Sequence, residues 1–444
     1  MLKQFITLFC VAAASFALPA KGQGGSVMTL RDCMQYAVSS STKMRIRNAE
    51  TGDARIARRD AILTLFTPRI SASSSAGYSF GRGLDPQTNT YATLTSFSNG
   101  YGINASYTLF DGFTAVNNLK IAKTSLLISE SQEKQEEANI CLAVMEAYYN
   151  VVYYKRLADV YEEQAATAEQ ALRKAQRQEE LGQIGHADVV QLEADLADRR
   201  YDLINARNRY EDQRMTLSDL LFWSLDEELI IDTELPAWQA ESLNADAVVD
   251  FALGHHPELL IAGWNVDNAR RQLSTAKWQL LPTLSASAGW STSYYSRQGS
   301  IADPFRSQLK NNSGEYVSFS LSIPVYERLS RHSDISRRRN ALTKVKAEFD
   351  QKRRDIESEV RRAMQDRDGA SSAYLQAQHK AGVQEEAYML NLRKLEQGLI
   401  SPLEFQTAND NYLRAKADEM NSLFQYLIKQ AVVRYYNGES YLDQ

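Results

Sequence analysis

Few residues of this 444-residue chain have the types and spacing that catalysis or metal binding would need. The five histidines are His186, His255, His256, His332 and His379. None of them forms a metal-ligand pair with another at helical spacing, and no nucleophile motif accompanies them. We therefore expect neither an enzyme nor a site for a metal or a cofactor.

The chemistry that the sequence does offer is that of a polar lining. Between Arg69 and Phe80 the even positions are mostly apolar, whereas the odd positions are all small and polar. This period of two predicts a strand with two unlike faces. The same alternation predicts four strands, at about 69–81, 100–110, 283–295 and 315–326.

The chain carries this pattern twice. Pro68-Arg69-Ile70-Ser71-Ala72-Ser73 returns as Pro282-Thr283-Leu284-Ser285-Ala286-Ser287. In each half a polar stretch, 81–100 or 296–314, separates the two strands and is typical of a hairpin loop. The self-similarity predicts two structural repeats.

Helical periodicity fills most of the rest. Helices are expected at about 30–66, 113–181 and 187–222 in the first repeat, and at about 247–280, 328–397 and 402–436 in the second. Steps of three and four predict a coiled-coil seam. Its residues are Val144, Ala147, Val151, Tyr154, Ala158, Tyr161, Ala165, Ala168, Leu172 and Ala175. The helix breaks near Gly182 and Gly398 align at one common offset, together with Ile184 and Ile400, and Asp188 and Glu404.

The ends of the chain and of its repeats are marked by composition. A positive start and an apolar run from Phe5 to Leu18 predict a signal peptide over residues 1–23. The first repeat then covers 24–223, a connecting segment 224–246, the second repeat 247–436 and a tail 437–444. After the signal peptide, no segment has 18 uninterrupted apolar residues.

Charge and cysteine content exclude some functions. The net charge is −5 with 24% charged residues, so a nucleic acid partner has no global electrostatic support. Cys33 and Cys141 remain after signal cleavage, which is no disulfide framework. We expect two buried apolar residues, with a single bridge as the alternative.

Four amphipathic strands cannot close a barrel, because about eight strands are the practical minimum. A bilayer offers no water to an unpaired strand edge, so membrane insertion requires two chains with eight strands or three with twelve. The serine face would line the lumen. The outward face would offer interface aromatics: Tyr78, Phe80, Tyr101, Tyr107, Trp290 and Tyr294. A soluble sandwich and a structural coiled-coil protein of the envelope without a channel are the alternatives.

With these features in view, the chain resembles the TolC-like outer membrane factors. The shared features are the duplication, the prolines before the strand pairs, Leu109-Phe110-Asp111-Gly112-Phe113 after the first hairpin, and the paired motifs around Gly182 and Gly398. The resemblance covers the chain from Leu30 to about Tyr436. His255-His256-Pro257 falls where that family has a turn into a helix, so we interpret it as structural.

The resemblance implies a mainly α fold with a membrane β-barrel. Each chain would be a duplicated unit of helix, β-hairpin, long helix, turn and helix. A homotrimer would form a 12-stranded barrel in the outer membrane lipid of a Gram-negative bacterium and a periplasmic α-helical coiled-coil tunnel. The function implied is an exit duct of multidrug efflux or type I secretion. A periplasmic adaptor would connect it to an RND or ABC inner-membrane transporter.

The resemblance also implies functional residues at the helix breaks. Family members narrow the periplasmic entrance with acidic side chains, which here match Asp188 and Glu404. Two places depart from the family pattern. Thr407 stands where a second acid often follows, and the second hairpin ends in Pro324-Val325-Tyr326-Glu327-Arg328 without the usual Asp-Gly. Stabilisation of a helix start is the alternative role for both acids. The adaptor-docking candidates are Gly182, Ile184, Gly185, Gly398, Ile400 and Ser401.

Overall fold

The computed structural model describes residues 27–85, 89–224, 227, 229–234, 243–298, 301 and 303–443. The expected signal peptide, and most of the expected connecting segment, lie outside these ranges. Contacts divide the chain into two compact units. The tip unit comprises Met1–Ser41, Cys141–Gln239 and Tyr374–Phe424, and the sheet unit comprises Thr42–Ile140, Ala240–Ala373 and Gln425–Gln444. Each unit therefore takes segments from both sequence repeats.

The helices follow the duplication. The first half contains α1 (Leu30–Ser40), α2 (Thr42–Phe66), α3 (Thr114–Glu180) and α4 (His186–Leu221). The second half contains α5 (Ala245–His255), α6 (Pro257–Trp278), α7 (Phe305–Asn311), α8 (Ser330–Glu396) and α9 (Pro402–Tyr436), followed by a short 3₁₀ turn, η1 (Tyr441–Asp443). Both α3 and α8 have 67 residues. None of the helices in the described ranges contains a stretch with the length and the apolar character of a membrane-spanning helix.

Two of the expected helices are each divided in the structure. The expected helix 30–66 breaks at Ser41, and the expected helix 247–280 breaks at His256. Both break residues are extended, with φ, ψ of −58°, 128° at Ser41 and −62°, 128° at His256. Pro257 explains the second break, since proline disfavours a helical conformation in the preceding residue and suits the first turn of a new helix.

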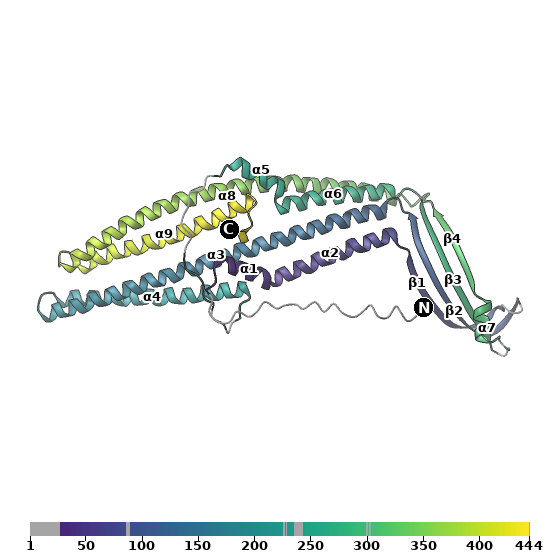
Figure 1. Ribbon diagram of the computed structural model, residues 1–444, viewed down its shortest axis with the longest axis horizontal. Helices are drawn as coiled ribbons and strands as arrows, with labels where there is room; N and C mark the ends of the chain where they lie inside the picture. The colour runs from purple at the N-terminus through teal and green to yellow at the C-terminus, as the bar shows by residue number, and fades with distance from the viewer. Residues whose placement is uncertain are drawn as a thin grey trace. The chain divides into compact units, whose positions relative to one another are not determined.

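The four strands form one antiparallel sheet in the order β1-β2-β3-β4, within the sheet unit (Figure 1). They are β1 (Arg69–Asp85), β2 (Thr90–Phe110), β3 (Thr283–Arg297) and β4 (Gly314–Ser322). The expected loop over 81–100 is wrong, because β1 continues to Asp85 and β2 begins at Thr90. Alternation continues through Tyr91, Thr93, Thr95 and Phe97, and these residue types favour strands.

The second hairpin also differs from expectation. Its loop contains the short helix α7. The last strand ends at Ser322 rather than near 326, because Pro324 cannot continue a hydrogen-bonded ladder.

The register gives the sheet two unlike faces. Ser73 pairs with Gly102 and Gly102 with Ser291, so these residues share one face, which we call the serine face. Ile70 pairs with Ala105, Ala105 with Ala288, and Ala288 with Val317 on the opposite face, which we call the apolar face. The small polar residues of the serine face include Ser71, Ser73, Ser75, Gly77, Gly102, Asn104, Ser106, Ser285, Ser287, Gly289, Ser291, Ser318 and Ser320, and the same face also carries Tyr295 and Tyr316.

The coiled-coil seam expected along α3 is confirmed by burial. The buried members are Val144, Ala147, Val151, Ala158, Ala165, Ala168, Leu172 and Ala175, and the two tyrosines of the seam are half-buried. In the tip unit Ala168, Leu172 and Ala175 of α3 pack with Val189, Leu192 and Leu196 of α4. A separate cluster in the sheet unit joins α5, α8 and α9 through Val249, Val360 and Val433.

Candidate functional site

The two helical tips, residues 181–185 between α3 and α4 and residues 397–401 between α8 and α9, share one backbone geometry. Gly182 has φ +69° and Gly398 has φ +70°, in the left-handed region that favours glycine. Each glycine ends its helix in a Schellman motif. The hydrogen bonds are Gly182 N–H to Glu179 O (2.8 Å), Gln183 N–H to Gln178 O (2.8 Å), Gly398 N–H to Leu395 O (2.9 Å) and Leu399 N–H to Lys394 O (2.9 Å).

Packing does not require a glycine at either tip. A Cβ atom added to Gly182 or Gly398 would meet no heavy atom within 4 Å. The left-handed backbone is therefore the local reason for glycine, and no other part of the described chain covers either position. Such a surface is accessible to a partner.

The two tips differ in how the returning helix is capped. At the second tip the N–H of Glu404 donates to Ser401 Oγ and the N–H of Ser401 donates to Glu404 Oε2, both at 3.3 Å. This is a capping box, which gives Glu404 a structural role. At the first tip Gly185 is the N-cap and supplies no side-chain bond to the helix, while Asp188 lies exposed in the first turn.

Not every tip residue expected from the sequence points outward. Gly185 and Ser401 are exposed, but Ile184 is half-buried and packs against the cluster formed by α3 and α4. Ile400 is also half-buried. Conversely, the sequence pattern did not predict the exposed apolar side chains at and beside the tips. They are Leu181 (72% exposed), Leu399 (68%) and Leu403 (61%). The sequence did contain a signal for them, because each is an apolar residue that lies next to a tip glycine or a helix start and outside the coiled-coil seam.

A buried ionic group joins the two helical hairpins of the tip unit. The Arg199 guanidinium on α4 donates to Asp195 Oδ1 on the same helix and, at 2.7 Å, to Asp410 Oδ1 on α9. Desolvation raises the pKa of Asp195, although the attraction of Arg199 opposes this shift. Desolvation would lower the pKa of Arg199, but its hydrogen bond to Asp410 and its attraction to Asp195 hold it above the usual value.

This ionic group was also missed in the sequence, although its signal was present. Asp195 and Arg199 fall among the apolar seam positions of α4, beside Leu192 and Leu196, where a charged residue is out of pattern. Both charged side chains are almost fully buried, with side-chain exposures of 9% and 4%. Charges buried at this level are paired because an isolated buried ion is costly.

The strand-to-helix junctions of the sheet unit repeat each other in geometry but not in sequence. After β2, Gly112 and Phe113 have φ of +65° and +61°; after β4, Arg328 and Leu329 have φ of +50° and +61°. The second junction therefore reaches the same left-handed pair without glycine. At Gly112 a Cβ atom would lie 2.4 Å from the carbonyl oxygen of Trp278, so glycine is required there.

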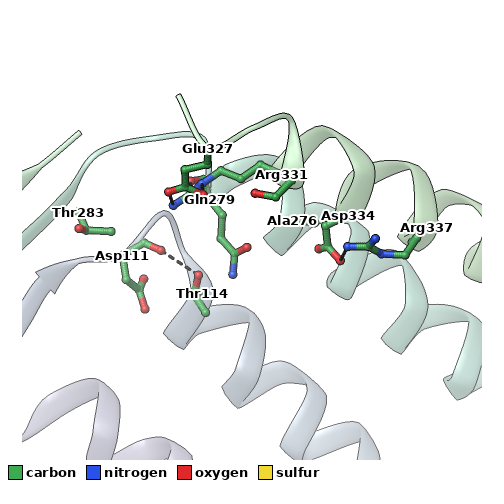
Figure 2. Close-up of a pocket in the computed structure, with 10 residues that line it drawn as sticks. Asp111, Thr114, Ala276, Gln279, Thr283, Glu327, Arg331, Asp334 and Arg337 are labelled. Carbon is green, nitrogen blue, oxygen red and sulfur yellow. Dashed lines mark hydrogen bonds and ion pairs between the residues drawn. The ribbon is translucent and has the colours of Figure 1, made fainter. Parts of the chain in front are cut away.

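A cavity of about 550 Å³ lies at these junctions. Figure 2 shows its lining, with the Arg331 and Glu327 side chains side by side and Asp111 near the start of α3. Arg331 Nη2 donates to Glu327 Oε1 at 2.8 Å, and the Ala115 N–H donates to Asp111 Oδ2 at 2.8 Å. These pairs brace the starts of α8 and α3. Within the described ranges no cluster of side chains could hold a metal ion.

The six expected interface aromatics all lie on the apolar face of the sheet, as the register shows. Tyr78 and Phe80 are largely exposed, at 68% and 75%. Tyr107, towards the helices, donates its hydroxyl to Leu65 O at 2.6 Å. Tyr294 and Tyr101 both lie against Phe305 of α7, with ring centroids 5.1 Å and 6.5 Å away.

The fold defines a class before any comparison is made: duplicated long helical hairpins combined with a small, two-faced antiparallel sheet. Solved structures share it. The outer membrane protein VceC of Vibrio cholerae matches with a TM-score of 0.76 over 93% of this chain and 96% of that one, at 14% identity. The CmeC outer membrane channel of Campylobacter jejuni matches with a TM-score of 0.77 over 96% and 90%, at 14% identity.

The sequence itself matches the family model "Outer membrane efflux protein" over residues 47–221 and 248–439, and the chain belongs to that family. Family membership places it in the outer membrane and bears out the resemblance seen in the sequence. The outer membrane efflux protein BepC of Brucella suis is 25% identical over 73% of this chain, which spans 64% of BepC. The outer membrane protein TolC of Vibrio cholerae is 24% identical over 85% of this chain and 86% of its own length.

Proposed function

We propose that this protein is the outer membrane exit duct of a tripartite efflux pump or type I secretion system. It conducts substrate passively from a periplasmic adaptor and an inner-membrane transporter of RND or ABC type to the exterior. The register of the four strands is the observation that carries the proposal. It gathers most of the serine and glycine on one face and most of the apolar side chains on the other, as a water-filled pore in lipid requires.

A single chain does not complete such a pore. Its sheet ends in two edges, β1 and β4, and lipid cannot satisfy the backbone groups of a strand edge. Three copies that join β4 of one to β1 of the next supply twelve strands and close the sheet into a barrel. This homotrimer is the assembly that the family resemblance implies.

The two tips are the proposed contact with the adaptor. Their exposed groups are the backbone around Gly182, Gly185, Gly398 and Ser401, together with the exposed leucines beside them. Ile184 and Ile400 are half-buried at the tips, and Ile184 packs against the cluster formed by α3 and α4. Asp188 and Glu404 are the proposed entrance constriction, where three copies of each acid would attract cations and repel one another. The capping box ties Glu404 to its helix, so Asp188 is the acid less occupied by a structural role.

The docking role is tested by a bulky charged side chain at the second tip. In Gly398→Glu the new side chain projects into open space, so we expect loss of export with normal trimer assembly. Gly398→Asn is the matched control, because asparagine tolerates the left-handed region better than most residues and adds no charge.

The measurement compares both variants with a deletion strain for sensitivity to dyes, detergents and antibiotics and for secreted proteins. Assembly is followed by electrophoresis of unheated membranes. Normal export by the glutamate variant would refute the docking role. A monomeric, water-soluble purified protein would refute the duct itself and favour a structural coiled-coil protein.

A further inference from the structure

The short helix α7 occupies the place that the far half of β4 would take in a regular sheet. Here the far half of a strand means the half remote from α2 and α6. Although β3 has 15 residues, β4 has only 9, and their pairing stops at Ser291 with Gly314. Beyond that point the open edge of β3 meets α7 (Figure 1). The contacts are Thr292 Oγ1 to Leu309 O (2.6 Å), Asn312 Nδ2 to Ser293 O (2.8 Å) and the two bonds of Gln308 to Tyr295.

One side chain imitates a neighbouring strand. The Tyr295 N–H donates to Gln308 Oε1 at 3.0 Å, and Gln308 Nε2 donates to Tyr295 O at 2.9 Å. The amide thereby satisfies both backbone groups that a paired residue would satisfy. Gln308 is 8% exposed, and its Nε2 also donates to Asp303 O at 3.0 Å. No further strand can add to β3 at this point, so α7 closes this stretch of edge.

The opposite edge of the sheet is longer than the strand available to cover it. β1 has 17 residues and β4 has 9, so pairing between copies leaves at least 17 − 9 = 8 residues of β1 without a strand partner, whatever the register. The element that continues the line of β4 is α7. In the assembly proposed above, α7 of one copy therefore faces the far half of β1 of the next.

A row of aromatic rings crosses the apolar face between these two places. It runs from Phe80 and Tyr78 on β1 through Phe97 on β2 and Tyr294 on β3 to Phe305 on α7. Successive ring centroids are 6.3, 4.9, 6.3 and 5.1 Å apart. The exposed rings lie at the two sides of the row, with Phe80 at 75% and Tyr78 at 68% on β1 and Phe305 at 46% on α7, whereas Phe97 and Tyr294 between them are half-buried.

We propose that α7 docks against the far half of β1 of a second copy of this chain, which brings Phe305 beside Phe80 and Tyr78 of that copy. The occupant is a second copy because the row would then continue across each boundary and close into a ring. Aromatic pairs favour offset and edge-to-face contacts at the spacings already seen within the row. The inference rests on the proposed trimer and adds to it a contact that strand pairing does not supply.

Cysteine pairs in the full-length protein test this contact in intact outer membranes. We expect the Phe305→Cys/Phe80→Cys variant, oxidised and then quenched with N-ethylmaleimide, to give covalent dimers and trimers that survive heating in detergent. Each single variant should give none, since the native Cys33 and Cys141 are buried. Phe305→Cys/Ser79→Cys is the matched control, because Ser79 is the adjacent residue on the serine face. Phe305→Cys/Tyr78→Cys offers a second position if Phe80→Cys assembles poorly.

Assembly is measured separately by light scattering of the purified detergent complex. If the protein is trimeric but neither Phe305→Cys/Phe80→Cys nor Phe305→Cys/Tyr78→Cys forms cross-links, the docking of α7 is overturned and the duct remains. Equal cross-linking by the Ser79 control also overturns it, because the contact would then not be specific to the apolar face. A monomer in light scattering removes the proposed assembly, and the inference falls with it.

Discussion

The Arg199 guanidinium lies 2.7 Å from the Asp410 carboxylate and joins α4 to α9 through a contact whose arginine is 4% exposed. The same guanidinium neutralises Asp195, whose side chain is 9% exposed. One buried cation therefore serves two acids in the tip unit. Removing it would leave Asp195 buried without a countercharge.

Arg199→Ala is expected to destabilise the helical hairpins by about 3 kcal/mol, the typical cost of removing one partner of a buried pair. Burial already raises the pKa of Asp195, and the variant raises it further. A carboxyl with a raised native pKa binds a proton more tightly when folded, so stability falls as the pH rises through that range. The deficit relative to the wild type should thus be larger at pH 7.5 than at pH 5.

Thermal unfolding followed by circular dichroism at both pH values checks this prediction. Arg200→Ala is the matched control, because Arg200 is 58% exposed and its ion pair with Glu169 spans 3.6 Å. Exposed pairs contribute little, so the control should unfold close to the wild type. A deficit of Arg199→Ala that does not change with pH would contradict the role assigned to Asp195.

The two strand-to-helix junctions should differ in how much they depend on glycine. Gly112→Ala places a Cβ 2.4 Å from Trp278 O in a left-handed backbone, and we expect a loss of about 2 kcal/mol or failed assembly. Arg328→Gly relieves left-handed backbone strain of ~1 kcal/mol, but glycine loses a similar amount through its larger conformational entropy in the unfolded chain. We therefore expect little change in the free energy of unfolding. The melting temperature of the assembled protein in detergent measures both. Equal damage by the two exchanges would refute the explanation.

The effect of the acidic charges at the entrance can be measured separately from the contribution of these residues to helix capping. Glutamine also completes a capping box, so Glu404→Gln removes the charge and keeps the helix start. Combined with Asp188→Asn, it should reduce the preference for cations over anions in planar bilayers. Ser401→Ala should instead cost about 1 kcal/mol of stability and leave ion preference unchanged. Unchanged selectivity in the double variant would remove both acids from the constriction.

Cys33 is expected to be unreactive in the folded protein. Burial, with a smaller contribution from Asp32, raises the pKa of its thiol to about 12, so the reactive thiolate is scarce at pH 7–9. Maleimide should label neither Cys33 nor Cys141 in the native protein, since both side chains are buried, but should label both in urea without reductant. Ser39→Cys, exposed on the same helix, is the control that should react at once. Mass spectrometry would detect a native disulfide as missing label in urea.

Local pattern was sufficient for much of this fold. Alternation along β1 predicted its two faces, and the spacing of Val144 to Ala175 predicted the seam of α3, because side-chain direction follows directly from helical and strand geometry. The full length of the first hairpin was missed, since glycine and polar residues in 81–100 resemble a loop until cross-strand pairs such as Gly83 with Ala92 are known.

Other features depended on contacts between distant segments. Nothing in the sequence near Gln308 indicates that its amide completes the edge of β3, or that Arg199 meets Asp410. The role of Glu404 likewise changed once its bond to Ser401 was seen. The sequence by itself determined the repeats, the amphipathic faces and the glycine turns, because each depends on residues near in the chain. Tertiary structure alone decided which charges pair and which edges are closed, because those energies arise only when distant segments exclude water together.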